Sequence, residues 1–160
     1  MEAPIKRTPE DWDKFFYAIA VLAAGQSKDP DRKVGAVLVS PDRRQVSPGF
    51  NGFPPDIDDF PELLADKAFK LEHMVHAEDN CLRQAPFQPA GCTVYVTRFP
   101  CLHCAFKLRA AGIRRVVAPR PDLGHARWGK SWAMSVAVLT RAGILITYEV
   151  ESIDHETVTG

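Results

Sequence analysis

Two short motifs constrain this chain more than any other feature of its sequence. His76-Ala77-Glu78 is followed downstream by Pro100-Cys101-Leu102-His103-Cys104. One imidazole and two thiolates are good zinc ligands, and three protein ligands leave the fourth tetrahedral position to water, as in a catalytic zinc site. Glu78 is close enough to the histidine to exchange protons with that water without being a ligand itself. The sequence therefore predicts an enzyme whose fold brings both motifs to one zinc ion.

Two other interpretations of the cysteine pair stay open at this point. C-x-x-C also serves redox-active dithiols, but a redox role leaves the His-Ala-Glu segment without a function. A closed structural zinc site needs a fourth protein ligand, for which the sequence offers Cys81, Cys92, His73 and His103. His103 lies between the two cysteines and is badly placed to reach the same ion, while Cys81 and Cys92 are also explained as small buried side chains. Neither interpretation gives Glu78 a role.

Composition favours one soluble domain over residues 1–160. The chain has 46% hydrophobic and 25% charged residues, which is typical of a globular protein with a sizeable core. Its formal net charge is zero, which argues against a long nucleic acid or an anionic membrane as a partner. There is no apolar stretch near the roughly 20 residues of a membrane span and no signal-peptide core at the start. With two of four cysteines assigned to zinc, we expect a cytoplasmic protein.

The remaining pattern predicts alternating strands and helices. We expect helices over residues 8–25, 76–84, 101–111 and 130–142, and strands over 34–39, 45–49, 93–97, 115–118 and 144–150. The segment 53–73, rich in Pro and Asp, is expected to hold at most one short helix. The strand-helix alternation in the second half requires parallel pairing through right-handed crossovers. We therefore predict an α/β fold with a mixed five-stranded sheet flanked by helices.

Further motifs resemble the deoxycytidylate deaminase family. They are Ser27-Lys28-Asp29-Pro30, the segment Lys33 to Val39, Gly49-Phe50-Asn51-Gly52-Phe53-Pro54, His76-Ala77-Glu78 with Asn80, and Phe99 to Cys104. H-x-E with P-C-x-x-C is itself an established signature of zinc deaminases that act on nucleobases. The Ser-Lys-Asp-Pro and Gly-Phe-Asn-Gly elements look specifically like the deoxycytidylate branch. The resemblance extends over residues 16–150, nearly the whole chain.

The resemblance implies a cytidine-deaminase-like three-layer sandwich and zinc-dependent hydrolysis of dCMP to dUMP with release of ammonia. By matching position it assigns His76, Cys101 and Cys104 as zinc ligands and Glu78 as the proton shuttle. It also implies a homo-oligomer, either a hexamer or a dimer, with dCTP and dTTP as effectors. Two alternatives stay open. One is a deaminase of another small substrate, such as a 5-substituted dCMP, a nucleoside or guanine, and the other is an inactive nucleotide-binding regulator.

Substrate contacts are expected at Asn51, Ala77, Ser27, Lys28 and Trp128. The resemblance implies that Asn51 contacts the sugar or base and that the Ser27-Lys28 loop binds nucleotide, although Asn51-Gly52 is equally typical of a turn. A free N–H of Ala77 at a helix start is expected to help orient the base. Trp128 is expected either to stack on the base as part of a lid or to lie in a surface loop. We expect Lys28 to contact a phosphate, with other cations nearby at Arg32, Lys33, Arg127 and Lys130.

Three features depart from the family pattern. Asp79 replaces the apolar residue common after the motif's glutamate, and Arg98 stands where apolar residues are frequent. The segment 122–128 lacks the Tyr-His-Asp seen in many members. Asp79 and Arg98 are expected to bear on the wall of the substrate pocket, and the segment 122–128 is expected to bear on the contacts to the phosphate and the base.

Overall fold

The computed structural model describes residues 1–149, and its centre is one five-stranded sheet. The strands are β1 (Gly35–Val39), β2 (Val46–Phe50), β3 (Thr93–Val96), β4 (Arg115–Ala118) and β5 (Leu145–Tyr148), in the spatial order β2-β1-β3-β4-β5. β1 pairs antiparallel with β2 and β3, whereas β4 pairs parallel with β3 and β5. The predicted mixed sheet is confirmed. Val150, the expected end of the last strand, lies outside the described residues.

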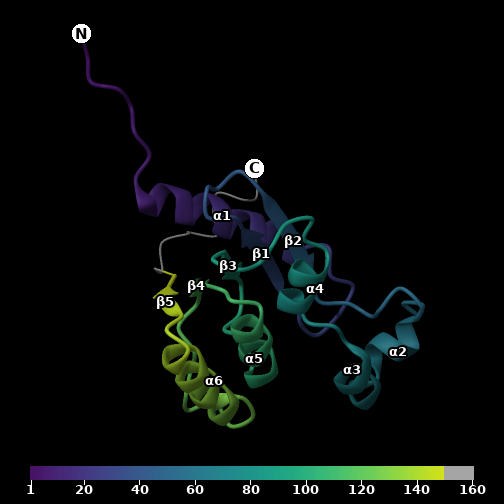
Figure 1. Cartoon of the computed structure of the whole chain (residues 1–160). Coiled ribbons are helices and arrows are strands. Elements are labelled where there is room, and N and C mark those ends of the chain that lie inside the picture. The colour runs from purple at the N-terminus through teal and green to yellow at the C-terminus, as the bar shows by residue number, and fades with distance from the viewer. Residues whose placement is uncertain (150–160) are drawn as a thin grey trace.

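Helices cover both faces of the sheet (Figure 1). α1 (Pro9–Ala24) covers one face, and α4 (Ala77–Arg83), α5 (Leu102–Ala110) and α6 (Gly129–Arg141) cover the other. A hydrophobic core lies on each face of the sheet, and alternate residues of each strand pack into one core or the other. This follows because successive side chains of a strand point to opposite faces. Val37 and Tyr95 pack with Phe16 of α1, while Leu38 and Val94 pack toward α4, α5 and α6. The α/β three-layer sandwich expected from the sequence is therefore confirmed.

Local signals explain how the first helix begins. The Thr8 Oγ1 accepts a hydrogen bond from the Asp11 main-chain N–H at 3.2 Å, and the Thr8 N–H donates to the Asp11 carboxylate at 2.9 Å. Together these bonds form a capping box, and Pro9 takes the first helical position, where its missing N–H costs nothing.

None of the helices in the described part of the chain combines the length and apolar character needed to cross a membrane.

The segment between β2 and α4 contains two short helices, so the expectation of at most one was wrong. They are α2 (Pro61–Ala65) and α3 (Lys67–His73), which project beside the sandwich (Figure 1). The Asp66 carboxylate caps α3 by accepting from the N–H groups of Ala68 and Phe69 at 2.9 and 3.0 Å. Neither hydrophobic core includes a residue from 53–75. This segment is therefore an addition to the sandwich rather than part of its core.

A buried lysine attaches α3 to the rest of the protein. The Lys70 Nζ donates to the Asp29 carboxylate at 2.8 Å and to the Asp31 carboxylate at 2.5 Å. The side chains of Lys70 and Asp29 are only 10% and 9% exposed. Removing one partner of such a pair leaves a buried charge without compensation, which is costly. The pair therefore fixes where α3 lies relative to the loop before β1.

α4 lies very close to β2, and Gly49 makes this approach sterically possible. A Cβ at Gly49 would lie 2.4 Å from the Cys81 main-chain nitrogen and 2.6 Å from the Ala77 carbonyl oxygen. Ser47 Oγ also donates to the Cys81 carbonyl at 2.8 Å. These contacts fix the position of α4, and with it the residue that begins the helix, His76.

Candidate active site

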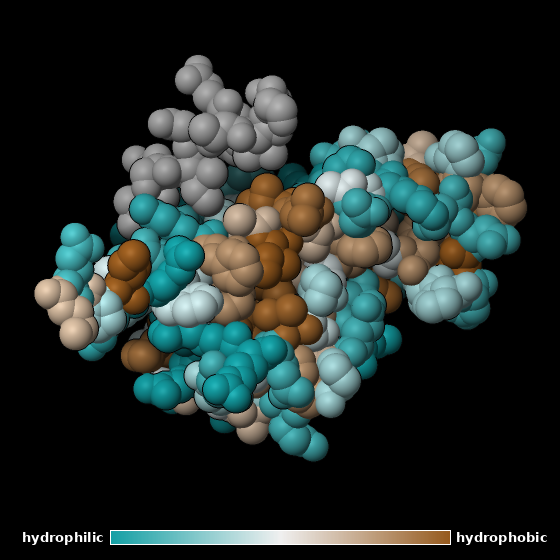
Figure 2. Space-filling model, turned by 90° about the horizontal axis from the view of Figure 1, so that it is seen from above, coloured by the Kyte–Doolittle hydropathy of each residue, from teal (hydrophilic) through white to brown (hydrophobic). Residues whose placement is uncertain are grey.

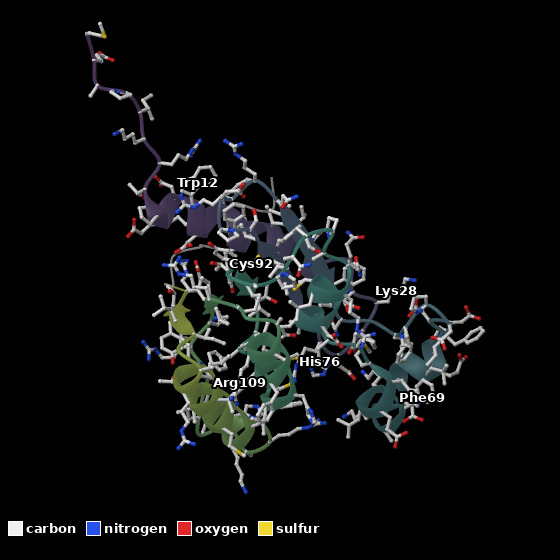
Figure 3. The ribbon with its side chains drawn as sticks, viewed as in Figure 1. Trp12, Lys28, Phe69, His76, Cys92 and Arg109 are labelled. Carbon is white, nitrogen blue, oxygen red and sulfur yellow. The ribbon has the colours of Figure 1, made fainter. Side chains whose placement is uncertain are left out.

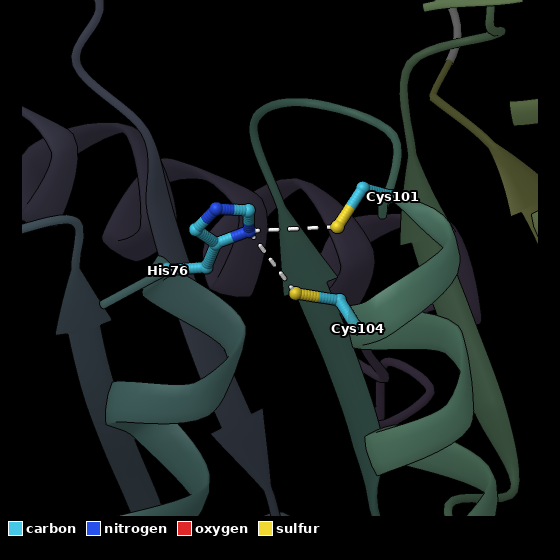
Figure 4. A group of neighbouring side chains, drawn as sticks. All are labelled: His76, Cys101 and Cys104. Atoms are coloured by element: carbon cyan, nitrogen blue, oxygen red, sulfur yellow. Dashed lines mark hydrogen bonds between the residues drawn. The ribbon is translucent and has the colours of Figure 1, made fainter. Parts of the chain in front are cut away.

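Three ligand side chains meet at the N-termini of two helices (Figure 4). His76 is the N-cap residue of α4, Cys101 is the N-cap residue of α5, and Cys104 lies in the first turn of α5. The His76 Nδ1 is 3.5 Å from the Cys101 Sγ and 3.4 Å from the Cys104 Sγ. All three ligand atoms lie within 4.8 Å of one another. The fold thus brings together the residues that the sequence selects as metal ligands.

The spacing of these atoms fits zinc. Zinc–nitrogen and zinc–sulfur distances of about 2.05 and 2.3 Å at a tetrahedral angle place nitrogen and sulfur about 3.6 Å apart, close to the observed separations. Within residues 1–149, this is the single group of three or more His, Cys, Asp or Glu side chains with the spacing of a metal site. Cys81 and Cys92 instead donate to the main-chain carbonyls of Glu78 and Gln88. The described residues therefore provide three ligands and leave one position open, which argues against the closed structural site.

The two sulfurs are prepared for metal binding. A hydrogen bond from the Cys104 thiol, supported by the His76 imidazole, lowers the pKa of Cys101 to about 4 despite burial. The same hydrogen bond raises the pKa of Cys104. The arrangement therefore favours a thiolate on Cys101 beside a thiol on Cys104, and a bound metal would favour loss of the second proton.

Glu78 lies beside the ligands without joining them. It occupies the first turn of α4, two residues after His76, and is 4% exposed. Burial raises the pKa of Glu78 above its ordinary value, while the nearby His76 opposes that effect. A raised pKa makes the carboxylate a stronger base, which suits a group that takes and returns protons in general acid–base catalysis.

A cavity of about 360 Å³ opens in front of the ligands. His76, Glu78 and Cys101 line it, together with four cations besides Lys70, namely Arg32, Lys67, Arg98 and Arg127. None of these four has a carboxylate oxygen within 4.0 Å among residues 1–149. By contrast, Asp29 and Asp31 in the lining are both paired with Lys70. The cavity therefore has a positive wall whose charges are free to meet an anionic ligand.

Two of the cations are held by aromatic rings. The Arg98 guanidinium carbon lies 5.0 Å from the Trp128 ring centroid and 5.1 Å from that of Trp132. The Arg127 guanidinium carbon lies 5.3 Å from the Trp128 ring centroid. Stacking on an indole orients a guanidinium while leaving its N–H donors available for a planar anion.

Comparison with known proteins identifies the family. Residues 10–119 match the family model described as the cytidine and deoxycytidylate deaminase zinc-binding region. The chain belongs to this deaminase family. The zinc cofactor predicted from the sequence agrees with that family and with the ligand group of this structure.

Individual relatives extend the match over most of the chain. A protein of Aliivibrio fischeri described as an uncharacterized deaminase in the luxG 3′ region is 36% identical over 138 residues, covering 86% of this chain and 92% of that protein. The deoxycytidylate deaminase of Mycobacterium phage D29 is 37% identical over 69% of this chain and 95% of its own length. Human deoxycytidylate deaminase is 34% identical, and the chain spans only 64% of its length.

A solved structure shares the fold of this deaminase. The dCMP deaminase of cyanophage S-TIM5, crystallised in complex with dCMP and dUMP, superimposes with a TM-score of 0.69. The match covers 90% of this chain and 100% of the phage chain at 20% sequence identity. The comparison supports the cytidine-deaminase-like architecture predicted from the sequence.

The substrate residues that the sequence predicted are spread over two places. Asn51, Ala77 and Trp128 line the cavity of the deaminase. The Asn51 side chain already supports the main chain, because its Oδ1 accepts from the Val34 N–H at 2.8 Å and its Nδ2 donates to the Arg32 carbonyl at 2.9 Å. The contact from Asn51 to the sugar or base stays a prediction.

Ser27 and Lys28 lie outside that lining. Ser27 is 2% exposed, and its hydroxyl donates to the Asn51 carbonyl at 2.9 Å, which supports the loop rather than a ligand. Lys28 pairs with Asp59 at 2.7 Å, and its side chain is 68% exposed. Figure 3 shows Lys28 displaced from His76, on the side of the molecule toward α2. Of the other cations proposed for a phosphate, Arg32 and Arg127 line the cavity, whereas Lys33 and Lys130 do not.

Lys67 and Lys70 are cavity residues that the sequence interpretation missed. Both lie on α3, in the segment that was expected to be mainly loop. A signal was present, because Asp66 is a good N-cap residue and the Lys-Ala-Phe-Lys-Leu-Glu that follows has high helix propensity. The pairing of Lys70 with Asp29, a distant residue in sequence, had no such local signal.

Proposed function

We propose that the chain hydrolyses dCMP to dUMP with release of ammonia. The observation that carries the proposal is a buried glutamate beside a three-ligand zinc site, in a cavity whose lining also holds unpaired cations. The first feature supports deamination of a nucleobase, and the second supports a substrate with a phosphate. Relatives named deoxycytidylate deaminase support the same choice.

Each residue of the site has a distinct role in the proposed deamination. His76, Cys101 and Cys104 would hold zinc, which when bound would supply an activated water. Glu78 accepts one proton of the water as its oxygen bonds to C4 of cytosine, and passes that proton to N3. It then takes the second proton from the new C4 hydroxyl and gives it to the amino group, which leaves as ammonia while the C4 carbonyl forms. The first turn of α4 has no side-chain cap, so the Ala77 main-chain N–H is available to orient the base.

The first test is a comparison of substrates. We expect ammonia release from dCMP with a kcat/KM at least about tenfold above that for deoxycytidine, because one charge-assisted contact to the phosphate is worth roughly 1.5 to 3 kcal/mol. An ammonia-release assay with dCMP, CMP, dCTP, deoxycytidine, guanine and 5-substituted dCMP measures this directly. Faster turnover of deoxycytidine than of dCMP would reject the nucleotide assignment, and the absence of ammonia from every substrate would favour a regulatory protein.

A second test asks which cation contacts the phosphate. Arg127→Gln should lower kcat/KM for dCMP by about ten- to hundredfold and leave deoxycytidine nearly unchanged, since only the nucleotide uses that charge. The parallel variant Lys28→Gln removes a cation that pairs with Asp59 outside the cavity lining, so it should change neither substrate by more than about twofold. A selective loss for dCMP in the Lys28 variant alone would restore the phosphate role that the sequence suggested for Lys28.

The assembly state, the effectors and the location stay predictions. We infer a homo-oligomer, for which the exposed apolar side chains of α1 give support: Phe15 is 54% exposed and Leu22 is 74% exposed. Figure 2 shows hydrophobic residues gathered in the middle of the face that is seen from above. Covering such residues against a second copy would remove apolar surface from water. Control by dCTP and dTTP and a cytoplasmic location belong to the same proposal.

A further inference from the structure

Asp79, one of the departures from the family pattern, joins the two helices that supply the metal ligands. It is 8% exposed and lies in the first turn of α4, after His76. One carboxylate oxygen accepts from the Lys107 Nζ at 2.5 Å, and the other accepts from the Arg83 Nε at 3.0 Å. Lys107 lies on α5, one turn beyond Cys104, whereas Arg83 lies on the same helix as Asp79. A single carboxylate therefore forms one bond between the helices and one within a helix.

The two ligand helices share one hydrophobic core, but their hydrogen-bonded anchors lie in different parts of the fold. α4 is anchored to β2, because the Asn80 Nδ2 donates to the Phe50 carbonyl at 2.7 Å and Gly49 allows close contact. α5 is anchored to α6, because the Leu102 N–H donates to the Ser131 Oγ at 3.1 Å. Through residues 1–149, the Asp79–Lys107 pair is the one ion pair between α4 and α5. Packing in the shared core is not directional, so the ion pair is the directed polar contact that opposes separation of the histidine from the cysteines.

We propose that the Asp79–Lys107 ion pair is a positioning pair that holds the histidine half and the cysteine half of the zinc site at the spacing the metal needs. Neither residue is a ligand. The Asp79 side chain is 11% exposed and the Lys107 side chain is 48% exposed, so solvent screens the pair from one side only. Burial favours a higher pKa for Asp79, but the hydrogen bonds from Lys107 and Arg83 outweigh it and lower the pKa, which keeps the carboxylate charged.

The chain offers a matched pair of variants for the test. Lys107→Met removes the bond between the helices, and Arg83→Met removes the bond within α4 while Asp79 and its other partner stay. Zinc transfer from the loaded protein to an excess of a coloured chelator measures how firmly the metal is held. We expect Lys107→Met to release zinc about fivefold faster than the wild type and Arg83→Met to stay within about twofold, which is the size expected of one partly exposed ion pair. Lys107→Arg should restore retention.

A double-mutant cycle separates positioning from simple helix stabilisation. If the pair positions the ligands, Asp79→Asn and Lys107→Met should be non-additive in zinc release, because both remove the same contact. Equal zinc release from Lys107→Met and Arg83→Met, or wild-type retention by Lys107→Met, would overturn the proposal. The proposal rests on the zinc site of the proposed function but not on its substrate. A wild-type protein inactive on dCMP that still shows the expected zinc-release pattern would therefore defeat only the substrate assignment.

Discussion

Glu78→Gln should abolish deamination while leaving zinc in place. Glutamine keeps the size and position of the buried side chain, but it cannot accept and return a proton. General acid–base catalysis typically contributes about 10² to 10⁴-fold, and Glu78 serves more than one transfer here, so turnover should fall by at least that range. Steady-state ammonia release and metal analysis of the same preparation measure both quantities.

The matched control for this variant is Glu72→Gln, which removes an exposed carboxylate on α3. It should keep wild-type turnover and zinc, since an isolated surface charge contributes little. More than about a tenth of wild-type activity in Glu78→Gln would be incompatible with a proton-shuttle role. Loss of zinc from that variant would instead mean that Glu78 also supports the ligands.

Cys104→Ala should produce a protein that neither retains zinc nor turns over substrate. Cys104 is 2% exposed and supplies one of three protein ligands, so its loss leaves two, which is too few for a stable site. Wild-type protein purified without chelator should contain one zinc per chain. Metal analysis by mass spectrometry together with the ammonia assay checks both outcomes, and we expect zinc in the variant to fall below about a tenth of an equivalent.

Cys81→Ala is the control for the cysteine experiment. Cys81 is also buried, but its thiol donates to the Glu78 carbonyl and is not grouped with the ligands. That variant should retain its zinc, even if the lost side chain lowers its thermal stability. A full equivalent of zinc in Cys104→Ala, or loss of zinc from Cys81→Ala, would contradict the assigned ligand set.

The sequence predicted the zinc site well because its information is local. Each ligand lies at or near a helix N-terminus, and the two cysteines have the short spacing of one helical turn. The periodic spacing of apolar residues identified the strands and the longer helices, because that signal is also local in the sequence. Only one long-range inference was needed, that His76 meets the cysteines, and the chemistry of zinc supplied it.

The cationic lining of the cavity was harder to predict because distant contacts determine it. Lys28 and Arg127 are both cations near motifs, and nothing local distinguishes them. Tertiary structure does, because Asp59 pairs with Lys28 while Trp128 holds Arg127 at the cavity. The sequence prediction allowed one short helix in residues 53–73 without placing it, because a helix of seven residues is too short to show the apolar periodicity that is the usual sequence signal.

The placement of α2 and α3 outside both cores has a consequence for how this protein can evolve. Residues 53–75 supply part of the cavity wall, yet their main buried attachment is the pairing of Lys70 with Asp29 and Asp31. Insertions, deletions and substitutions in such a segment disturb the packing of the sandwich little. Remodelling this segment can therefore change which ligands the cavity admits without rebuilding the helices that carry the zinc ligands.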